Sequence, residues 1–107
     1  MKKFLKEDKK AKSISYFLRS KNYVFGKKLL GFIEREFKKK KKDLRICLHK
    51  NQQEDHHDMV ILNKRKNFYR PHKHKKKGET YNVIKGQMLL LLFNNRGKIT
   101  FTCKLSK

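Results

Sequence analysis

The sequence predicts a small all-β domain at residues 44–107, preceded by a basic and partly helical N-terminal extension at residues 1–43. After residue 44, short apolar runs alternate with turn-forming residues, which is typical of an antiparallel sandwich or barrel. Before residue 44, apolar residues recur at helical spacing. A chain of 107 residues forms one domain at most. We expect its core between Tyr81 and Phe101, where apolar residues concentrate.

The N-terminal extension begins with a charged lead-in, residues 1–13, that shows no periodicity. An amphipathic helix is predicted within Ile14 to Phe37, with an apolar stripe formed by Phe25, Leu29, Phe32 or Ile33, and Phe37. Gly26 and Gly31 weaken this helix by about 1 kcal/mol each relative to alanine. The basic run Lys38 to Lys42 is typical of a solvated linker or a fraying helix end. A nuclear-import or RNA-binding signal is the less favoured alternative for this run.

The β domain is predicted to contain strands at Leu44–Leu48, Met59–Leu62, Phe68–Tyr69, Thr80–Ile84, Gln87–Phe93 and Lys98–Lys104. Pro71 lacks an N–H donor, so the strand at Phe68 should end in a bend. The run from Gln87 to Phe93 is apolar at successive positions, which predicts burial on both faces. Asn94 to Gly97 tolerate left-handed backbone, so this stretch is predicted to be a hairpin loop.

His72, His74 and Glu79 have a spacing that can hold one divalent metal. On a strand the two histidines share a face, and Glu79 can return to that face after a short bend. Two imidazoles and a carboxylate suit a transition metal such as Fe, Mn, Ni or Zn, and they leave coordination positions open. The alternative is that these are ordinary surface residues of a lysine-rich loop.

The metal-site spacing resembles the first motif of the cupin superfamily, G-x5-H-x-H-x(3,4)-E-x6-G, with Gly86 as its last residue. Lys66, beside Asn67, occupies the place of the leading glycine. The wider pattern is similar to the WbuC family of cupin-fold metalloproteins, over roughly Leu44 to Ile99. The matching residues are Arg45 to His49, Met59, Tyr69 to His74, Glu79-Thr80 and Gly86 to Gly97.

This resemblance implies a partial double-stranded β-helix, or jelly roll, whose first cupin motif spans residues 72–86. It also implies a metal-binding protein associated with bacterial surface-polysaccharide, or O-antigen, sugar metabolism. The reaction would be a metal-dependent isomerisation or epimerisation of a sugar or sugar nucleotide. Because the family has no firmly assigned reaction, enzyme status and catalytic residues stay open. A non-catalytic ligand-binding or scaffold cupin is the alternative.

Four residues are candidates for binding a sugar-like or anionic small molecule: Arg70, His49, His57 and Tyr69. On a strand, Arg70 would share the face of His72, where a guanidinium favours a carboxylate or phosphate. The resemblance places His57 or His49 at the lining of the pocket. The alternative for His57 is a solvated loop, and the alternative for Arg70 is an exposed basic side chain.

A second cupin motif, with a P-x-G and a further histidine, is not found after Gly86, since no histidine follows it. The residues therefore resemble the front part of a cupin. They correspond either to a truncated cupin fragment or to a cupin that a homodimer partner completes.

The formal net charge is +22, with +11 in residues 1–43 and +11 in residues 44–107. Lysine outnumbers arginine 25 to 6, which favours a compositional bias over a dedicated nucleic-acid interface. Non-specific polyanion binding still follows at low salt, and a basic nucleic-acid-associated protein is a third functional alternative. Cys47 and Cys103 are expected to be free thiols. With no signal peptide and no apolar run of ~20 residues, we expect a cytoplasmic protein without a membrane span.

Overall fold

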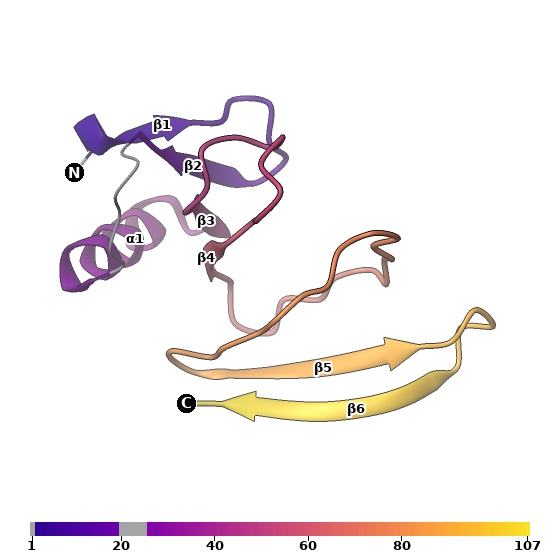
Figure 1. Ribbon diagram of the computed structural model, residues 1–107. Coiled ribbons are helices and arrows are strands. Elements are labelled where there is room, and N and C mark those ends of the chain that lie inside the picture. Colours follow the sequence, from indigo (N-terminus) through magenta and orange to yellow (C-terminus); the bar gives the residue numbers. More distant parts are fainter. Residues whose placement is uncertain (1, 20–25) are drawn as a thin grey trace. The chain divides into compact units, whose positions relative to one another are not determined.

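The computed structural model describes residues 2–19 and 26–107. It is rich in β-strands, with one α-helix in this part of the chain, and it divides into two compact units (Figure 1). Unit 1 spans Met1–Asn67 and unit 2 spans Phe68–Lys107. Within the described ranges, no helix is both long enough and apolar enough to cross a membrane.

Unit 1 is built around a four-stranded sheet with the order β1-β2-β3-β4. These strands are β1 (Leu5–Glu7), β2 (Ile14–Leu18), β3 (Leu44–Cys47) and β4 (Met59–Leu62), and β1 follows the short 3-10 helix η1 (Lys2–Phe4). The β2–β3 pair is parallel, whereas the outer pairs are antiparallel. Parallel neighbours need a crossover connection, and the helix α1 (Lys27–Lys40) provides it.

The core of unit 1 lies between α1 and the sheet. Leu29, Phe32 and Ile33 on α1 are buried, as the predicted apolar stripe requires. They belong to one hydrophobic cluster with Leu5, Tyr16, Leu44, Ile46 and Leu48. The predicted helix is therefore confirmed from Lys27 onward, whereas Phe25 lies outside the described residues.

The N-terminal part of the predicted helix is wrong, because Ile14–Leu18 form strand β2 instead. This segment is rich in β-branched and aromatic residues, and it pairs with strands on both sides. Ser15 in its middle is fully buried, and its Oγ accepts a hydrogen bond from Arg45 Nε at 2.9 Å. The strand thus gains partners from distant sequence that a local pattern cannot show.

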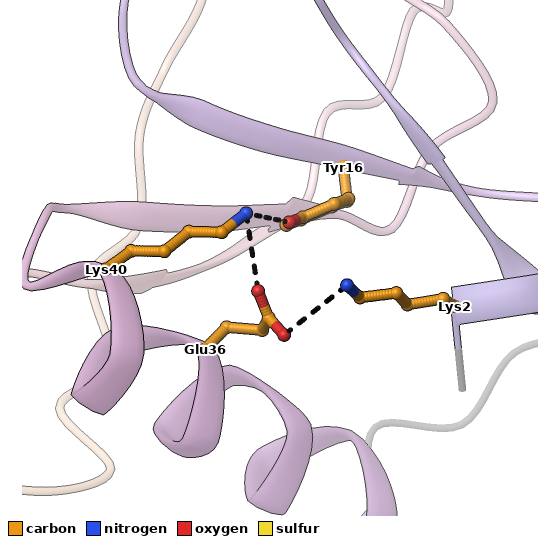
Figure 2. A network of polar contacts seen from close by, with 4 residues as sticks. All are labelled: Lys2, Tyr16, Glu36 and Lys40. Carbon is orange, nitrogen blue, oxygen red and sulfur yellow. Dashed lines mark hydrogen bonds and ion pairs between the residues drawn. The ribbon is translucent and has the colours of Figure 1, made fainter.

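A polar network joins the end of α1 to the sheet and to the N-terminus (Figure 2). The carboxylate of Glu36 is buried, with Lys40 Nζ at 3.3 Å and Lys2 Nζ at 3.9 Å. Lys40 Nζ also donates a hydrogen bond to the Tyr16 hydroxyl at 3.0 Å. α1 ends directly after Lys40, where Lys41 adopts a left-handed φ of 50°.

Unit 2 contains one antiparallel hairpin, formed by β5 (Gln87–Phe93) and β6 (Ile99–Ser106). The predicted hairpin loop is confirmed, and Gly97 in it has a positive φ of 79°. The prediction that β5 is buried on both faces is wrong, since Leu89 is 62% exposed. A two-stranded sheet has no second layer to cover it. The core lies in unit 1 and not between Tyr81 and Phe101.

The compact units divide between Asn67 and Phe68, whereas the sequence placed a boundary between residues 43 and 44. The difference arises because β1, β2 and α1 share one sheet and one core with β3 and β4. The strands predicted at Phe68–Tyr69 and Thr80–Ile84 do not form. Pro71 and the consecutive lysines Lys75 to Lys77 lie between them, and neither stretch has a partner strand in the described residues.

Candidate functional site

The predicted metal site lies on the irregular segment that precedes β5 in unit 2. Left-handed backbone bounds this segment on both sides, with a φ of 58° at Lys66 and 83° at Gly86. Lys66 occupies the place of the leading glycine of the cupin motif, so this position adopts a glycine-like conformation without being glycine. Four lysines and Gly78 lie in the middle of the segment, and nearly all of its residues are exposed and outside any sheet.

The structure brings the three predicted ligands together. Each of His72, His74 and Glu79 offers a ligand atom, and these atoms all lie within 4.8 Å of one another. His74 Nε2 is 2.9 Å from Glu79 Oε1. The rings of His72 and His74 lie edge to face, with centroids 4.9 Å apart. The shared strand face predicted for the two histidines is absent, and a bend of irregular backbone produces the cluster instead.

The distances within the cluster fit one small metal ion after modest movement. Metal–nitrogen and metal–oxygen bonds of about 2.0–2.2 Å place two ligand atoms at most about 4.4 Å apart. The His74–Glu79 contact already satisfies this limit, and the widest separation of 4.8 Å exceeds it by less than an ångström. All three side chains are exposed, so rotamer changes can close the difference. The donor set and its geometry therefore suit a divalent transition metal.

Tyr81 is a further member of the cluster that the sequence pattern did not reveal. Its hydroxyl donates a hydrogen bond to Glu79 Oε2 at 2.6 Å. This hydrogen bond, together with partial burial and the carboxylate charge, raises the pKa of Tyr81 to about 12. Glu79 therefore directs one oxygen to His74 and the other to Tyr81. The only signal in the sequence is the two-residue spacing from Glu79, which is too common to single out Tyr81.

The four candidate ligand-binding residues fall in different units. Tyr69 and Arg70 are exposed in unit 2, and the Arg70 carbonyl oxygen lies 3.4 Å from His72 Nδ1. His49 and His57 belong to unit 1, where their rings stack with centroids 4.2 Å apart. A ligand-binding role for all four stays a prediction.

His49 has an evident structural role in unit 1. Its side chain is buried and packs edge to face against the ring of Phe17. The backbone N–H of Asp58 donates to His49 Nδ1 at 3.3 Å. His49 therefore anchors the loop that joins β3 to β4, and the ring of His57, in the same loop, stacks on it.

An open surface cavity of about 450 Å³ lies in unit 1, beside the β1–β2 turn. Its lining carries four lysines and three acidic residues, and it includes none of the predicted site residues. Asp43 in this lining accepts hydrogen bonds from the Lys64 backbone and from the Asn67 side chain. The cavity and the metal cluster are thus separate features of the chain.

The family described as "Domain of unknown function (DUF6016)" matches residues 33–105. This match includes the end of α1, strands β3 to β5, β6 up to Leu105 and the whole His72, His74 and Glu79 cluster. No curated protein and no solved structure matches the chain. Since the family match covers more than half of the sequence, the chain belongs to the DUF6016 family.

Proposed function

We propose that this protein binds one divalent transition metal through His72, His74 and Glu79. The observation that carries the proposal is the convergence of their ligand atoms, all within 4.8 Å of one another. Three residues spread over eight positions of irregular, lysine-rich chain meet at one point, although neighbouring cationic side chains repel one another. Two neutral imidazoles and a carboxylate at such a point form a donor set for Fe, Mn, Ni or Zn.

We further propose that the metal site is of the WbuC cupin type. Support comes from the sequence motif, from the glycine-like backbone at Lys66 and from the positive φ at Gly86. Support also comes from the β5–β6 hairpin, because its turn is formed by Asn94 to Gly97, which belong to the stretch that resembles the WbuC family. On this proposal, the residues around the motif correspond to the front part of a jelly roll, and a homodimer partner or further chain completes it.

The proposed role is in sugar chemistry linked to bacterial surface polysaccharides, and it rests on the family resemblance. A bound metal would act as a Lewis acid on a carbonyl or hydroxyl oxygen of a sugar or sugar nucleotide. Arg70 lies next to the cluster in sequence and carries a guanidinium suited to a carboxylate or phosphate. Stoichiometric metal without turnover of any sugar would instead support the non-catalytic ligand-binding alternative.

Metal content after reconstitution tests the proposal. We expect close to one equivalent of metal per chain, measured by elemental analysis after removal of loosely bound ions. The affinity should be lower than that of a complete cupin site, because only three protein ligands are present and all are exposed. In the double variant His72→Ala with His74→Ala, two of three ligands are lost, and stoichiometric binding should disappear.

The double variant His56→Ala with His57→Ala is the matched control. It removes the same number of imidazoles from the same chain and leaves the cluster intact. We expect it to retain the metal content of the wild type. If the His72 and His74 variant holds as much metal as this control, the site assignment is wrong.

A further inference from the structure

The outer surface of α1 is dominated by cationic residues, and the half-buried Glu34 is its one acidic neighbour on the helix. Six residues of this helix are exposed, and each of them is lysine or arginine: Lys27, Lys28, Arg35, Lys38, Lys39 and Lys40. Lys40 reaches toward the sheet, where it contacts Tyr16, and it also contacts Glu36 one turn earlier in α1. The other five lie on the face opposite the buried residues, within an arc of roughly 120° at 3.6 residues per turn. We call these five residues the basic face.

The basic face concentrates charge that the sequence counts suggest is evenly spread. Residues 1–43 and 44–107 each carry +11, yet the helical repeat gathers five cations on one side of one element. From Lys28 to Lys39 the face extends for about 16 Å at 1.5 Å per residue. Gly31, which has no side chain, lies between Lys28 and Lys39 in the sequence. The Arg35 guanidinium lies beside Gly31, with its Nη1 3.0 Å from the position that a Cβ of residue 31 would occupy.

Helix stability explains only part of this arrangement, since Lys38 and Lys39 lie in the last turn, where cations interact favourably with the macrodipole. The first turn of α1 contains Lys27 and Lys28 and no acidic residue. Cations at a helix N-terminus oppose the macrodipole, at a cost of about 0.3–1 kcal/mol each. Arg35 and Lys39 are like charges at i and i+4, which repel by about 0.2–0.5 kcal/mol. A polyanion lying on this face would relieve both unfavourable terms.

We propose that the basic face of α1 binds the phosphate backbone of a nucleic-acid duplex without reading its sequence. A duplex strand carries one phosphate per about 3.4 Å of axis, so a 16 Å face meets about five phosphates of one strand. Five cations along a straight helix match that regular array. Lysine forms point-charge contacts with phosphate, which position a protein on a duplex and carry no base information.

Two other partner classes fit this face less well. An anionic membrane binds amphipathic helices that insert an apolar face, but the apolar face of α1 is buried against the sheet. Protein interfaces depend on aromatic or aliphatic anchors, and the exposed residues of α1 include none. A phosphodiester backbone needs neither feature. The proposal is independent of the metal site, since His72, His74 and Glu79 belong to unit 2.

The test compares two variants with equal charge change. The first replaces Lys28, Arg35 and Lys39 by glutamine. The control replaces Lys9, Lys10 and Lys12 by glutamine, in the exposed turn between β1 and β2 of the same unit. Fluorescence anisotropy measures the affinity for short DNA and RNA duplexes of mixed sequence between about 50 and 200 mM salt. Anionic phospholipid vesicles are the third probe, and circular dichroism verifies that both variants retain the helix.

Five phosphate contacts predict a slope of log affinity against log salt of about −4.5, or a loss of about 500-fold over that salt range. The α1 variant should reduce the magnitude of the slope by about 2.7, at 0.9 per phosphate contact removed. The control should leave the slope nearly unchanged. DNA and RNA of equal affinity indicate that the backbone alone is read.

Equal losses in the two variants would show that net charge, and not the basic face, determines binding, and this would overturn the proposal. Vesicle binding that exceeds duplex binding and depends on the same three residues would assign the face to a membrane instead. A preference for one duplex sequence that persists at about 200 mM salt would also contradict the proposal, because sequence-blind contacts collapse there.

Discussion

Glu79 connects the proposed metal site to a residue that is not a ligand. One oxygen of its carboxylate contacts His74 and the other accepts the Tyr81 hydrogen bond. A carboxylate held in this way presents a single oxygen to a metal, in a fixed direction. Such outer contacts orient ligands in known metal sites and influence their affinity. The Tyr81 hydrogen bond would therefore help the exposed cluster of His72, His74 and Glu79 to keep its geometry.

The raised pKa of Tyr81 gives a direct test of that contact. The Glu79 carboxylate accepts a hydrogen bond from the neutral phenol, so it opposes ionisation and raises the pKa from 10.0 to about 12. The hydrogen bond is then present below pH 10.0 and is lost as the pH rises through about 12. Tyrosinate absorbance of the wild type minus that of Tyr81→Phe isolates this one transition. When Glu79 is also replaced by alanine, we expect the pKa of Tyr81 to fall toward 10.0.

Two further results decide this prediction. The same difference measured in an Asp58→Ala background is the control, because Asp58 belongs to unit 1, and the transition should stay near 12. If Tyr81 ionises near 10.0 in the presence of an intact Glu79, the contact does not exist in solution.

At the scale of residues, the clustering of the three candidate ligands could be predicted from the sequence, but the reason for their convergence could not. Residue type and spacing single out His72, His74 and Glu79 among a background of lysines. The expected cause was a strand with both histidines on one face, whereas the chain bends irregularly there. Tyr81 was missed because its role depends on the direction of that bend. His49 was offered as a pocket residue, and its burial against Phe17 depends on contacts distant in sequence.

At the scale of elements, α1 holds the sheet through both its apolar stripe and the network of Figure 2. Glu36 is 4% exposed and would be costly to bury without partners. Lys40 supplies its nearer partner and also bonds to Tyr16. That hydrogen bond to Tyr16 and the interaction with Glu36 outweigh partial burial and raise the pKa of Lys40.

We expect Lys40→Met to destabilise unit 1 by about 1–2 kcal/mol, since it leaves the buried Glu36 carboxylate with only the more distant Lys2. The matched control is Lys39→Met, which makes the same substitution one position away on the exposed face. Its effect should stay within about 0.5 kcal/mol, as for most surface changes. Denaturant unfolding followed by circular dichroism measures both. Equal midpoints for the two variants would mean that the network contributes nothing to stability.

The helix and the strands differed in how far the sequence could predict them. Leu29, Phe32 and Ile33 recur at helical spacing, and a local pattern suffices to place them on one buried face. β2 was not predicted because its pairing partner β3 follows α1 in the sequence. In this pair Ser15 lies opposite Arg45. Parallel pairing of this kind depends on the crossover and leaves no local mark. β3, β4 and the β5–β6 hairpin were predicted, since turn residues bound each of them.

At the scale of the molecule, the apolar content of the chain does not coincide with its core. The richest apolar stretch forms the β5–β6 hairpin, and much of it faces solvent. Leu89 and Phe101 are 62% and 51% exposed, respectively. The smaller set of apolar residues in unit 1 forms the actual core because a helix and a four-stranded sheet cover each other. Burial follows from the layers available and not from hydrophobicity alone.

An exposed two-stranded hairpin is at best marginally stable by itself in water. Its edge strands also present unpaired backbone groups that can pair with another chain. We therefore expect unit 2 to form a homodimer that covers the hairpin of each copy. The net charge of +22 opposes this association, and salt screens that repulsion within about 8 Å at physiological ionic strength. The dimer should consequently be favoured as salt rises. This is the opposite of the trend expected for nucleic-acid binding, so the two forms of association can be distinguished.

Analytical ultracentrifugation over a range of protein and salt concentrations measures this assembly. The variant Leu89→Lys places a charge on the exposed hairpin face and should shift the protein to monomer. Phe4→Lys makes a comparable change at a 50% exposed site in unit 1, and we expect it to leave the dimer intact. A monomer at every concentration, with cooperative unfolding of the whole chain, would contradict the prediction. The hairpin would then be stable without a second copy, and the jelly roll proposed around the metal motif would lose the partner that it needs to complete its strands.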